Sequence, residues 1–295
     1  MRLQDRLYLS NAWPVNPPGI LSGIRQIDDN LGGLQPGELH AMGAPHGIGA
    51  TSLLLKCAIN AARHTAVVVA TTAAGTDVVE QMIRLQFGFA RGSVRVRAST
   101  SDEMFGHVLR HPVEIVDRVS DLDQLRSRID FTLDDLQKQG CNPSLLVIDC
   151  PDIAAPNYVD TNPCRQPSLR EVAKSRNIAV MVNIRLPILT DQERAEHHEI
   201  MKARPGYYFE DPEWRPEPPY PEDLDVWMEL ERGLYEAENI PSYGNRMLVV
   251  FRHRDQMFST IPFQITPEAG ICEEKEDIAI QIVREMDFDE LPPDA

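Results

Sequence analysis

Lysines, paired cysteines and long apolar runs are scarce in this chain of 295 residues. Only five of its 29 basic residues are lysines, namely Lys56, Lys138, Lys174, Lys202 and Lys275. The five cysteines are odd in number and form no C-x-x-C pair, which predicts reduced thiols in a cytoplasmic protein. No stretch approaches 18 apolar residues, and the N-terminus lacks a basic flank before an apolar run. We therefore expect neither a membrane span nor a signal peptide.

Net positive charge is missing as well. The formal net charge is −16, and most of it lies in two segments. Residues 191–240 hold 15 acidic and 5 basic side chains, and residues 271–295 hold 9 and 2. A molecule with this charge repels phosphate backbones, so we expect weak or no autonomous nucleic-acid binding. The remaining residues are nearly neutral and leave room for a local basic face.

Strand and helix patterns alternate along the first two thirds of the chain. Continuous apolar, β-branched runs such as TAVVVATT and PSLLVIDC are typical of strands buried on both faces of a parallel sheet. Amphipathic stretches separate them, such as DLDQLRSRIDFTLDDLQKQG and a helix at TDVVEQMIRLQFGFARG that we expect Thr76 to cap. The alternation predicts an α/β fold with a mostly parallel central sheet flanked by helices. LDVWMELERG and NRMLVVFRHRD then predict a strand pair, followed by a strand at FSTIPFQIT.

The pattern also predicts a domain at residues 20–272 and three further segments, of which two flank the domain and one interrupts it. Residues 1–19 are a proline-bearing N-terminal arm, and residues 273–295 are an acidic tail. An acidic, proline-rich insertion at about 190–222 interrupts the domain as a loop or partly disordered segment. Its aromatic residues either anchor a partner or pack on the domain itself; they are Tyr207, Tyr208 and Trp214.

The stretch GAPHGIGATS, residues 43–52, has the outline of a phosphate-binding loop. It follows a short strand and opens a helix, so backbone N–H groups and the helix dipole favour an anion there. The complete motif adds a lysine for the β/γ-phosphates and a Ser/Thr hydroxyl on Mg²⁺, but Ala50 stands at the lysine position. His46 is either a solvent-facing loop histidine or, when its ring is protonated, a positive charge near the phosphate. The residues predicted to contact nucleotide are Ala44, His46, Gly47, Ile48, Gly49, Ala50, Thr51 and Ser52.

Two interpretations of this loop remain open: weak nucleotide binding, or a strand–helix turn that only packs. Asp149 ends a strand at the place where nucleotide-binding α/β folds put a Mg²⁺-directing carboxylate. If nucleotide binds, Thr51 and Asp149 are the predicted Mg²⁺ residues. His197-His198-Glu199 is not expected to hold a metal, because adjacent histidines point to different faces.

Taken together, these stretches resemble the RecA-like ATPase domain of DnaB-type replicative helicases. SGIRQIDDNLGGLQPGEL is similar to the start of that domain, and SLLVIDC to its Walker B strand. SLREVAKSRNIAVMVNIRL, DLDVWMELER and LVVFRHRDQ follow in the family's order, so the resemblance covers roughly residues 20–272. It implies a RecA-like P-loop fold, ATP and Mg²⁺ as cofactors, and helicase activity. It also implies nucleotide bound between subunits, with an arginine finger donated in trans.

The chain departs from the family at the residues that carry the chemistry. The P-loop lysine is Ala50, and the family's catalytic glutamate falls in TTAAGT, where Asp77 is the only acid nearby in sequence. The Ser-Gln sensor pair is replaced by Ile184-Arg185. Arg252 and Arg254 are either the arginine finger with its charge kept or plain surface cations, and their place at a strand end favours the finger. Losing one charge-stabilising contact costs about 10²–10³ in rate, and losing the water-orienting carboxylate adds a comparable factor.

The sequence thus predicts a divergent DnaB-helicase-like protein without efficient ATPase or unwinding activity. We expect a binding, regulatory or ring-forming module linked to DNA replication or repair. ATP and Mg²⁺ would bind weakly, and the partner would be a second copy or a helicase-like protein. The alternative is an active ATP-dependent DNA helicase that uses substitute residues. A third class is a structural ring or filament subunit without nucleotide.

Overall fold

The computed structural model describes residues 19–89, 112–154, 169–186, 224–232, 245–252, 257–266 and 271–274. Residues 1–18 of the predicted arm, the acidic insertion and the tail beyond Glu274 lie outside these ranges. So do Arg254, the aromatic residues of the insertion and the sequence His197-His198-Glu199. Within the described ranges, no helix has the length and apolar character needed to cross a bilayer.

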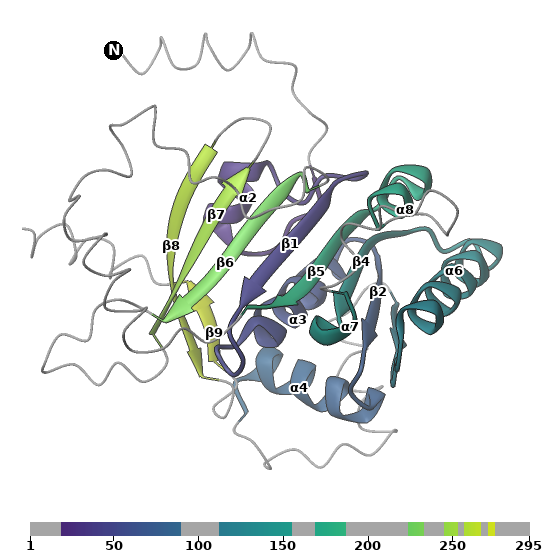
Figure 1. The fold of residues 1–295 in the computed structure, drawn as a ribbon, viewed down its shortest axis with the longest axis horizontal. Coiled ribbons are helices and arrows are strands. Elements are labelled where there is room, and N and C mark those ends of the chain that lie inside the picture. Colours follow the sequence, from purple (N-terminus) through teal and green to yellow (C-terminus); the bar gives the residue numbers. More distant parts are fainter. Residues whose placement is uncertain are drawn as a thin grey trace, which may run out of the picture.

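A nine-stranded sheet with the order β3-β2-β4-β5-β1-β6-β7-β8-β9 forms the centre of the molecule (Figure 1). The first six strands run parallel: β3 (Val113–Val116), β2 (Ala66–Thr71), β4 (Pro143–Asp149), β5 (Ala179–Arg185), β1 (Leu39–Ala44) and β6 (Val226–Arg232). The last three are antiparallel: β7 (Asn245–Arg252), β8 (Met257–Thr266) and β9 (Ile271–Glu274). The predicted α/β class and the strand pair of β6 and β7 are confirmed.

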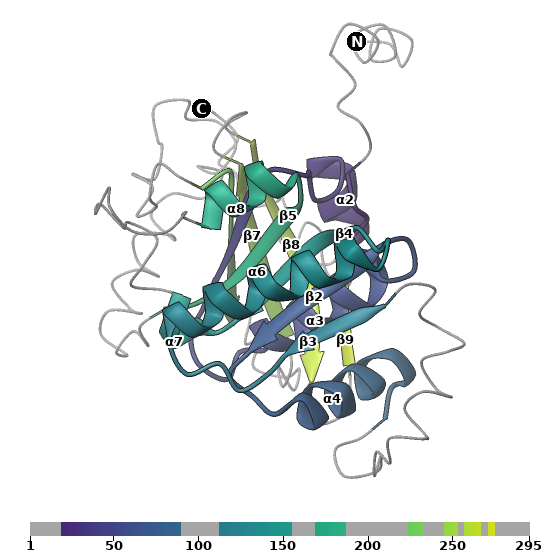
Figure 2. The ribbon, with the colours of Figure 1, turned by 90° about the vertical axis from the view of Figure 1, so that its right-hand side faces the viewer.

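Helices cover both faces of the parallel strands, which is why those strands are apolar without alternation (Figure 2). One face carries α2 (Arg25–Leu31), α3 (Ala50–Ala61) and α4 (Gly75–Phe87). The other carries α6 (Leu122–Lys138), α7 (Pro151–Ala154) and α8 (Leu169–Arg176). Successive strand residues alternate between the two layers, which we call the α3-side core and the α6-side core. Strand residues of the α3-side core include Val67, Val69, Leu145, Val147, Ala179 and Met181.

The start of α4 corrects one prediction. The sequence predicts Thr76 as the cap of this helix, but α4 begins at Gly75, with Ala74 as the capping position and no side-chain bond from it. The physical reason is a remote acceptor, because the carboxylate of Asp117 accepts a hydrogen bond from Gly75 N at 2.9 Å. A helix end can thus be satisfied by a residue distant in sequence, which a local pattern does not reveal.

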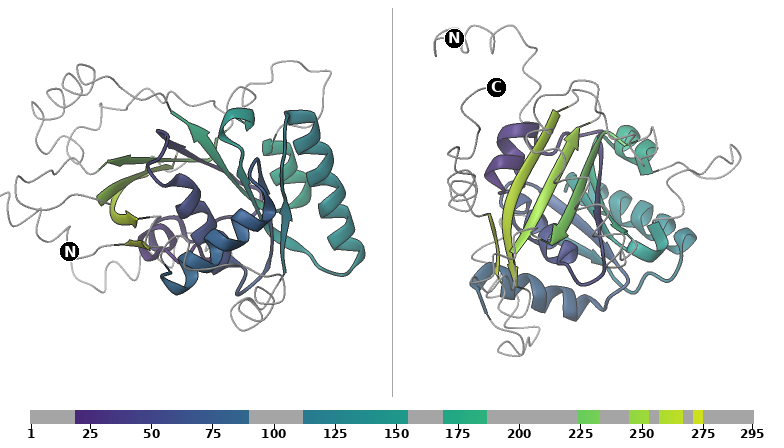
Figure 3. Two further views of the ribbon diagram at one scale, coloured as in Figure 1. Left: turned by 90° about the horizontal axis from the view of Figure 1, so that it is seen from below. Right: turned by 60° about the vertical axis from the view of Figure 1, so that its left-hand side comes forward.

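The antiparallel strands bring the end of the sheet back toward α3 (Figure 3). The side chain of Ile265 on β8 is buried in the α3-side core, and β9 lies against α3. Strand β9 was not predicted. It continues the sheet through Glu274, past the boundary that the sequence places between residues 272 and 273.

Candidate functional site

The loop that joins β1 to α3 has the backbone shape that its glycines permit. Gly47 and Gly49 have φ of +79° and +116°, in the range that side-chain-bearing residues rarely adopt. Gly49 is the N-cap of α3, no side chain caps this end, and the first turn contains no acidic residue. The N–H groups of the first turn therefore lack a side-chain acceptor and point out of the helix N-terminus, where an anion is favoured.

The predicted loop residues divide into a buried and an exposed set. Ala44, Ile48 and Ala50 are 4%, 5% and 7% exposed and belong to the α3-side core. His46 and Gly47 are exposed at the turn. The methyl group of Ala50 thus packs in the core. A complete phosphate-binding motif has a lysine at this position, and its side chain reaches the phosphates.

Ser52, in the first turn of α3, is buried at 1% exposure. Its Oγ accepts a hydrogen bond from Gln81 Nε2 of α4 at 3.2 Å. The hydroxyl therefore ties α3 to α4. Of the two hydroxyl residues predicted here, Ser52 has a structural contact and Thr51 is the one at the strand edge.

Thr51, Asp149 and Asn183 meet at the carboxyl edge of the sheet. Thr51 Oγ1 donates to Asp149 Oδ1 at 3.1 Å, and Asn183 Nδ2 donates to the same oxygen at 2.6 Å. The structure thus brings together the two predicted Mg²⁺ residues, which are 98 positions apart. It also adds Asn183, which the sequence does not predict because the resemblance draws attention to Ile184 and Arg185 instead. A single polar residue inside the apolar run IAVMVNI was the available signal.

Burial dominates the electrostatics of this cluster. Asp149 is 8% exposed, and its desolvation raises the pKa of its carboxyl group, against the lowering effect of the hydrogen bonds from Asn183 and Thr51. Burial, and then the charge of Asp149, raises the pKa of the neighbouring Cys150 to about 12. That thiol is neutral at physiological pH and is no nucleophile. Carboxylate and hydroxyl oxygens are ligands that Mg²⁺ prefers, so Thr51 and Asp149 fit a magnesium ion.

Four polar side chains form a row across neighbouring strands at this edge. They are Asp117 after β3, Thr71 on β2, Asp149 on β4 and Asn183 on β5, and we call them the polar row. Each continues the alternation that places a residue on the α3 side of the sheet. With strands about 4.8 Å apart, the Cα atoms of Asp117 and Asp149 are about 10 Å apart. The registers that set this row are Ala70↔Val116, Thr71↔Asp149 and Ile148↔Val182.

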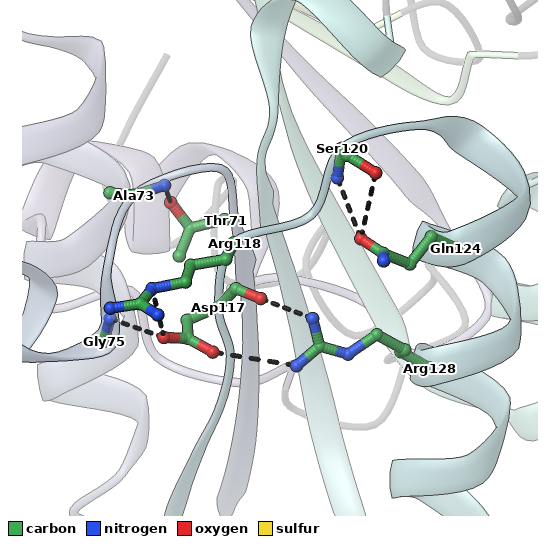
Figure 4. Close-up of polar contacts among 8 residues, drawn as sticks. All are labelled: Thr71, Ala73, Gly75, Asp117, Arg118, Ser120, Gln124 and Arg128. Atoms are coloured by element: carbon green, nitrogen blue, oxygen red, sulfur yellow. Dashed lines mark hydrogen bonds and ion pairs between the residues drawn. The ribbon is translucent and has the colours of Figure 1, made fainter.

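Asp117 is a second acid beside the segment TTAAGT, and the sequence reasoning missed it (Figure 4). Its carboxylate bonds Gly75 N, and its oxygens lie 3.8 Å from Arg118 Nε and 3.7 Å from Arg128 Nη2. Asp77, the substitute expected from sequence, is exposed in the first turn of α4. The two acids are 40 positions apart, so only the pairing of β2 with β3 reveals that Asp117 lies at this loop.

The segment after β2 is held by its own backbone as well. Thr71 Oγ1 accepts from Ala73 N at 3.1 Å, and Arg118 N donates to Ala73 O at 3.0 Å. Val119 N donates to Thr71 O at 3.0 Å. These bonds, together with Asp117, fix the turn where the family carries its catalytic glutamate, and this turn contains no acid.

Arg252 ends β7 at the edge of the sheet opposite the loop that joins β1 to α3. It pairs with Val226, which pairs with His40 near the start of β1, whereas the loop follows Ala44 at the end of β1. Four residues along the strand and two strand spacings place the Cα atoms of Arg252 and Ala44 about 16 Å apart. The backbone geometry therefore separates Arg252 from the loop of its own chain.

The rest of the described chain offers no further metal cluster. Groups of three or more His, Cys, Asp or Glu side chains arranged to hold a metal ion are absent from the ranges that the structure describes. The magnesium prediction therefore depends on Asp149 together with oxygen atoms from Thr51 and from a bound phosphate.

Comparison with known proteins identifies the fold. No family model and no curated protein matches the sequence. Among solved structures, the chain is similar to one described as an "ATPase Domain", with a TM-score of 0.59, 14% identity, and coverage of 92% of this chain and 97% of that one. It is also similar to a "DnaB-Like Replicative Helicase", with a TM-score of 0.57, 15% identity, and coverage of 92% of this chain and 66% of that one. The predicted RecA-like P-loop fold is thereby confirmed.

Proposed function

We propose that the protein is a divergent DnaB-helicase-like RecA-fold module that binds nucleotide phosphates weakly and hydrolyses them inefficiently. The observation that carries this proposal is the combination at one helix N-terminus. In support of the proposal, Gly49 is the N-cap of α3, Thr51 Oγ1 bonds Asp149 Oδ1, and Ala50 stands where the complete motif has its lysine.

Binding follows from the parts that remain. The first-turn N–H groups of α3 hold an anion without any side-chain charge, and the helix dipole contributes about 0.3–1 kcal/mol. Asp149 loses its desolvation penalty when a divalent cation neutralises it. Nucleotide affinity should therefore depend on Mg²⁺ and be lower than that of a complete phosphate-binding loop.

Slow hydrolysis follows from the parts that are missing. Phosphoryl transfer needs positive charge on the β/γ-phosphates and a carboxylate that positions water. Ala50 supplies no charge, and the turn after β2 carries no acid. Two missing contributions of about 10²–10³ each leave turnover far below that of a motor enzyme.

A second candidate is an active ATPase or DNA helicase that uses substitute residues. Asp117 favours it, because its carboxylate contacts the turn where the family places the glutamate. Its two arginine neighbours and its bond to Gly75 N argue for a structural carboxylate instead. We therefore rank this candidate second.

The position of Arg252 bears on assembly. Since its backbone lies about 16 Å from its own phosphate loop, an arginine finger at this end of β7 would act on a neighbouring subunit. We therefore propose that the partner is a second copy of this chain or a helicase-like subunit. We also propose that this protein is cytoplasmic and binds DNA only weakly by itself. The third class, a structural ring or filament subunit, predicts that assembly occurs without nucleotide. Measurement of the oligomeric state with and without Mg²⁺ and ADP tests this.

The test combines calorimetric titration of Mg²⁺·ATP with a turnover assay on the same sample. We expect measurable, Mg²⁺-dependent binding and negligible turnover. Turnover near that of ring helicases, abolished by Asp149→Asn, would establish the second candidate. Absence of binding at millimolar nucleotide would leave the structural class.

A further inference from the structure

The phosphate loop touches a strand from the antiparallel end of the sheet. A methyl group added at Gly49 would lie 2.5 Å from Cγ2 of Ile265 on β8, which is closer than real Cβ contacts come. Ile265 is 1% exposed, so this contact is enclosed in the α3-side core. No comparable contact surrounds Gly47, where an added methyl group meets nothing within 4 Å.

The contact is non-local in both sequence and topology. Strands β6 and β7 lie between β8 and β1 in the sheet order, and more than 200 positions separate the two residues in the chain. The antiparallel end of the sheet curls until β8 reaches the N-terminus of α3 and β9 lies against this helix (Figure 3). Ile265 thus packs against Gly49, the N-cap of α3.

We propose that Ile265 is a positioning residue that holds Gly49 in the conformation presenting the N-terminus of α3 to a phosphate group. Gly49 has a φ of +116°, and a glycine with no contact moves easily between such conformations. In the complete motif a lysine contacts the β/γ-phosphates, whereas Ala50 cannot, so this turn lacks that contact to a bound phosphate. Packing against the branched side chain of Ile265 restricts the glycine without it. This role deepens the proposed phosphate-binding function and rests on it.

Truncation of Ile265 should have an effect on the loop that truncation of an ordinary core residue does not have. Ile129 on α6 is a matched control, since it is 2% exposed and lies in the α6-side core, away from the loop. Truncation of either isoleucine to alanine creates a buried cavity of similar size and should lower global stability by a similar amount. Only the change at Ile265 should loosen the loop.

The first measurement is amide hydrogen exchange of the peptide covering residues 43–52, without nucleotide. We expect Ile265→Ala to accelerate exchange in this peptide about tenfold more than Ile129→Ala does, and Ile265→Val to restore most of the protection. Equal acceleration in the two alanine variants would overturn the proposal. This result does not depend on nucleotide, so it separates failure of the positioning role from failure of the phosphate-binding function.

The second measurement is a double-mutant cycle with pyrophosphate as the probe in the presence of Mg²⁺. Gly49→Ala alone should weaken pyrophosphate binding about tenfold, because of its backbone strain and its contact with Ile265. Ile265→Ala should partly rescue Gly49→Ala, while Ile129→Ala should not, since only neighbouring residues couple. Additive effects at positions 49 and 265 would count against direct positioning. If Ile265→Ala does not fold, Ile265→Leu replaces it in both measurements, because leucine keeps the buried volume and lacks the Cγ2 branch that faces Gly49.

Discussion

Two helices, α3 and α4, begin at the same edge of the sheet, and their N-termini differ. At α4, the carboxylate of Asp117 accepts from Gly75 N, and Asp77 lies in the first turn. At α3, the N-cap is a glycine, no side chain caps the end, and the first turn holds no acid. A third helix at this edge, α6, is capped by Asp121, which accepts from Gln124 N at 2.8 Å.

The difference bears on the two interpretations of the loop that the sequence left open. A turn that only packs gains about 1 kcal/mol from an Asp, Asn, Ser or Thr cap, and α4 and α6 both have an aspartate acceptor. The N-terminus of α3 has none, and it lies against the polar row. This contrast favours a phosphate-binding loop over a turn that only packs. Substitutions at the N-termini of α3 and α4 test that interpretation.

The largest expected effect is on the α3 side, at Gly49. Gly49→Ala adds a methyl group against Ile265 and forces a φ that alanine avoids, so the free energy of unfolding should fall by about 3 kcal/mol. Gly47→Ala is the matched control in the same loop, with a φ of +79° and no neighbour within 4 Å. It should cost about 1 kcal/mol. Urea denaturation measures both, and equal losses would contradict this account of the loop.

The next effect concerns the missing charge. Ala50→Lys should raise Mg²⁺·ADP and Mg²⁺·ATP affinity about tenfold, because one charged hydrogen bond to a phosphate contributes about 1.5 kcal/mol. The side chain must run from a buried Cβ to the loop surface with its charged end outside. Hydrolysis should stay negligible. Undetectable binding in this variant would mean a closed loop, and brisk hydrolysis would reveal an unrecognised base.

On the α4 side, Asp117→Ala should lower the free energy of unfolding by about 1 kcal/mol, the usual cost of losing a helix cap. Asp77→Ala is the control, because Asp77 is exposed and acts only through the helix dipole, for about 0.3 kcal/mol. Thermal unfolding compares the two variants. If turnover is present and Asp117→Ala alone removes it, the carboxylate is catalytic and the second candidate function is correct.

The two helix N-termini also show which features of the site the sequence predicts and which it does not. The parallel strands, α3, α6 and the Thr51 and Asp149 positions follow from periodicity, glycine placement and strand-end chemistry, and the structure has them where the patterns place them. Asp117, Asn183 and Ile265 do not follow, because each acts through a strand neighbour or a curled sheet end distant in sequence. Strand β9 was missed because its residues, ICEE, run directly into an acidic segment.

The smallest expected change in stability comes from the isosteric substitution Asp149→Asn. Thr51 and Asn183 both donate to Oδ1, which asparagine retains, so neither hydrogen bond is lost. Burial raises the pKa of Asp149 in the folded state above its unfolded value, so the folded protein binds this proton more tightly. The stability that Asp149 contributes is therefore full below the unfolded pKa and lost as pH rises through the folded pKa. Asp149→Asn lacks this loss, so its melting temperature relative to wild type should rise from acidic to neutral pH, while Mg²⁺-dependent nucleotide binding disappears. Thermal melts of both proteins across that pH range, without and with Mg²⁺, measure the difference. A variant that becomes relatively less stable as pH rises would show that the carboxylate is stabilised by charge and that burial does not dominate this site.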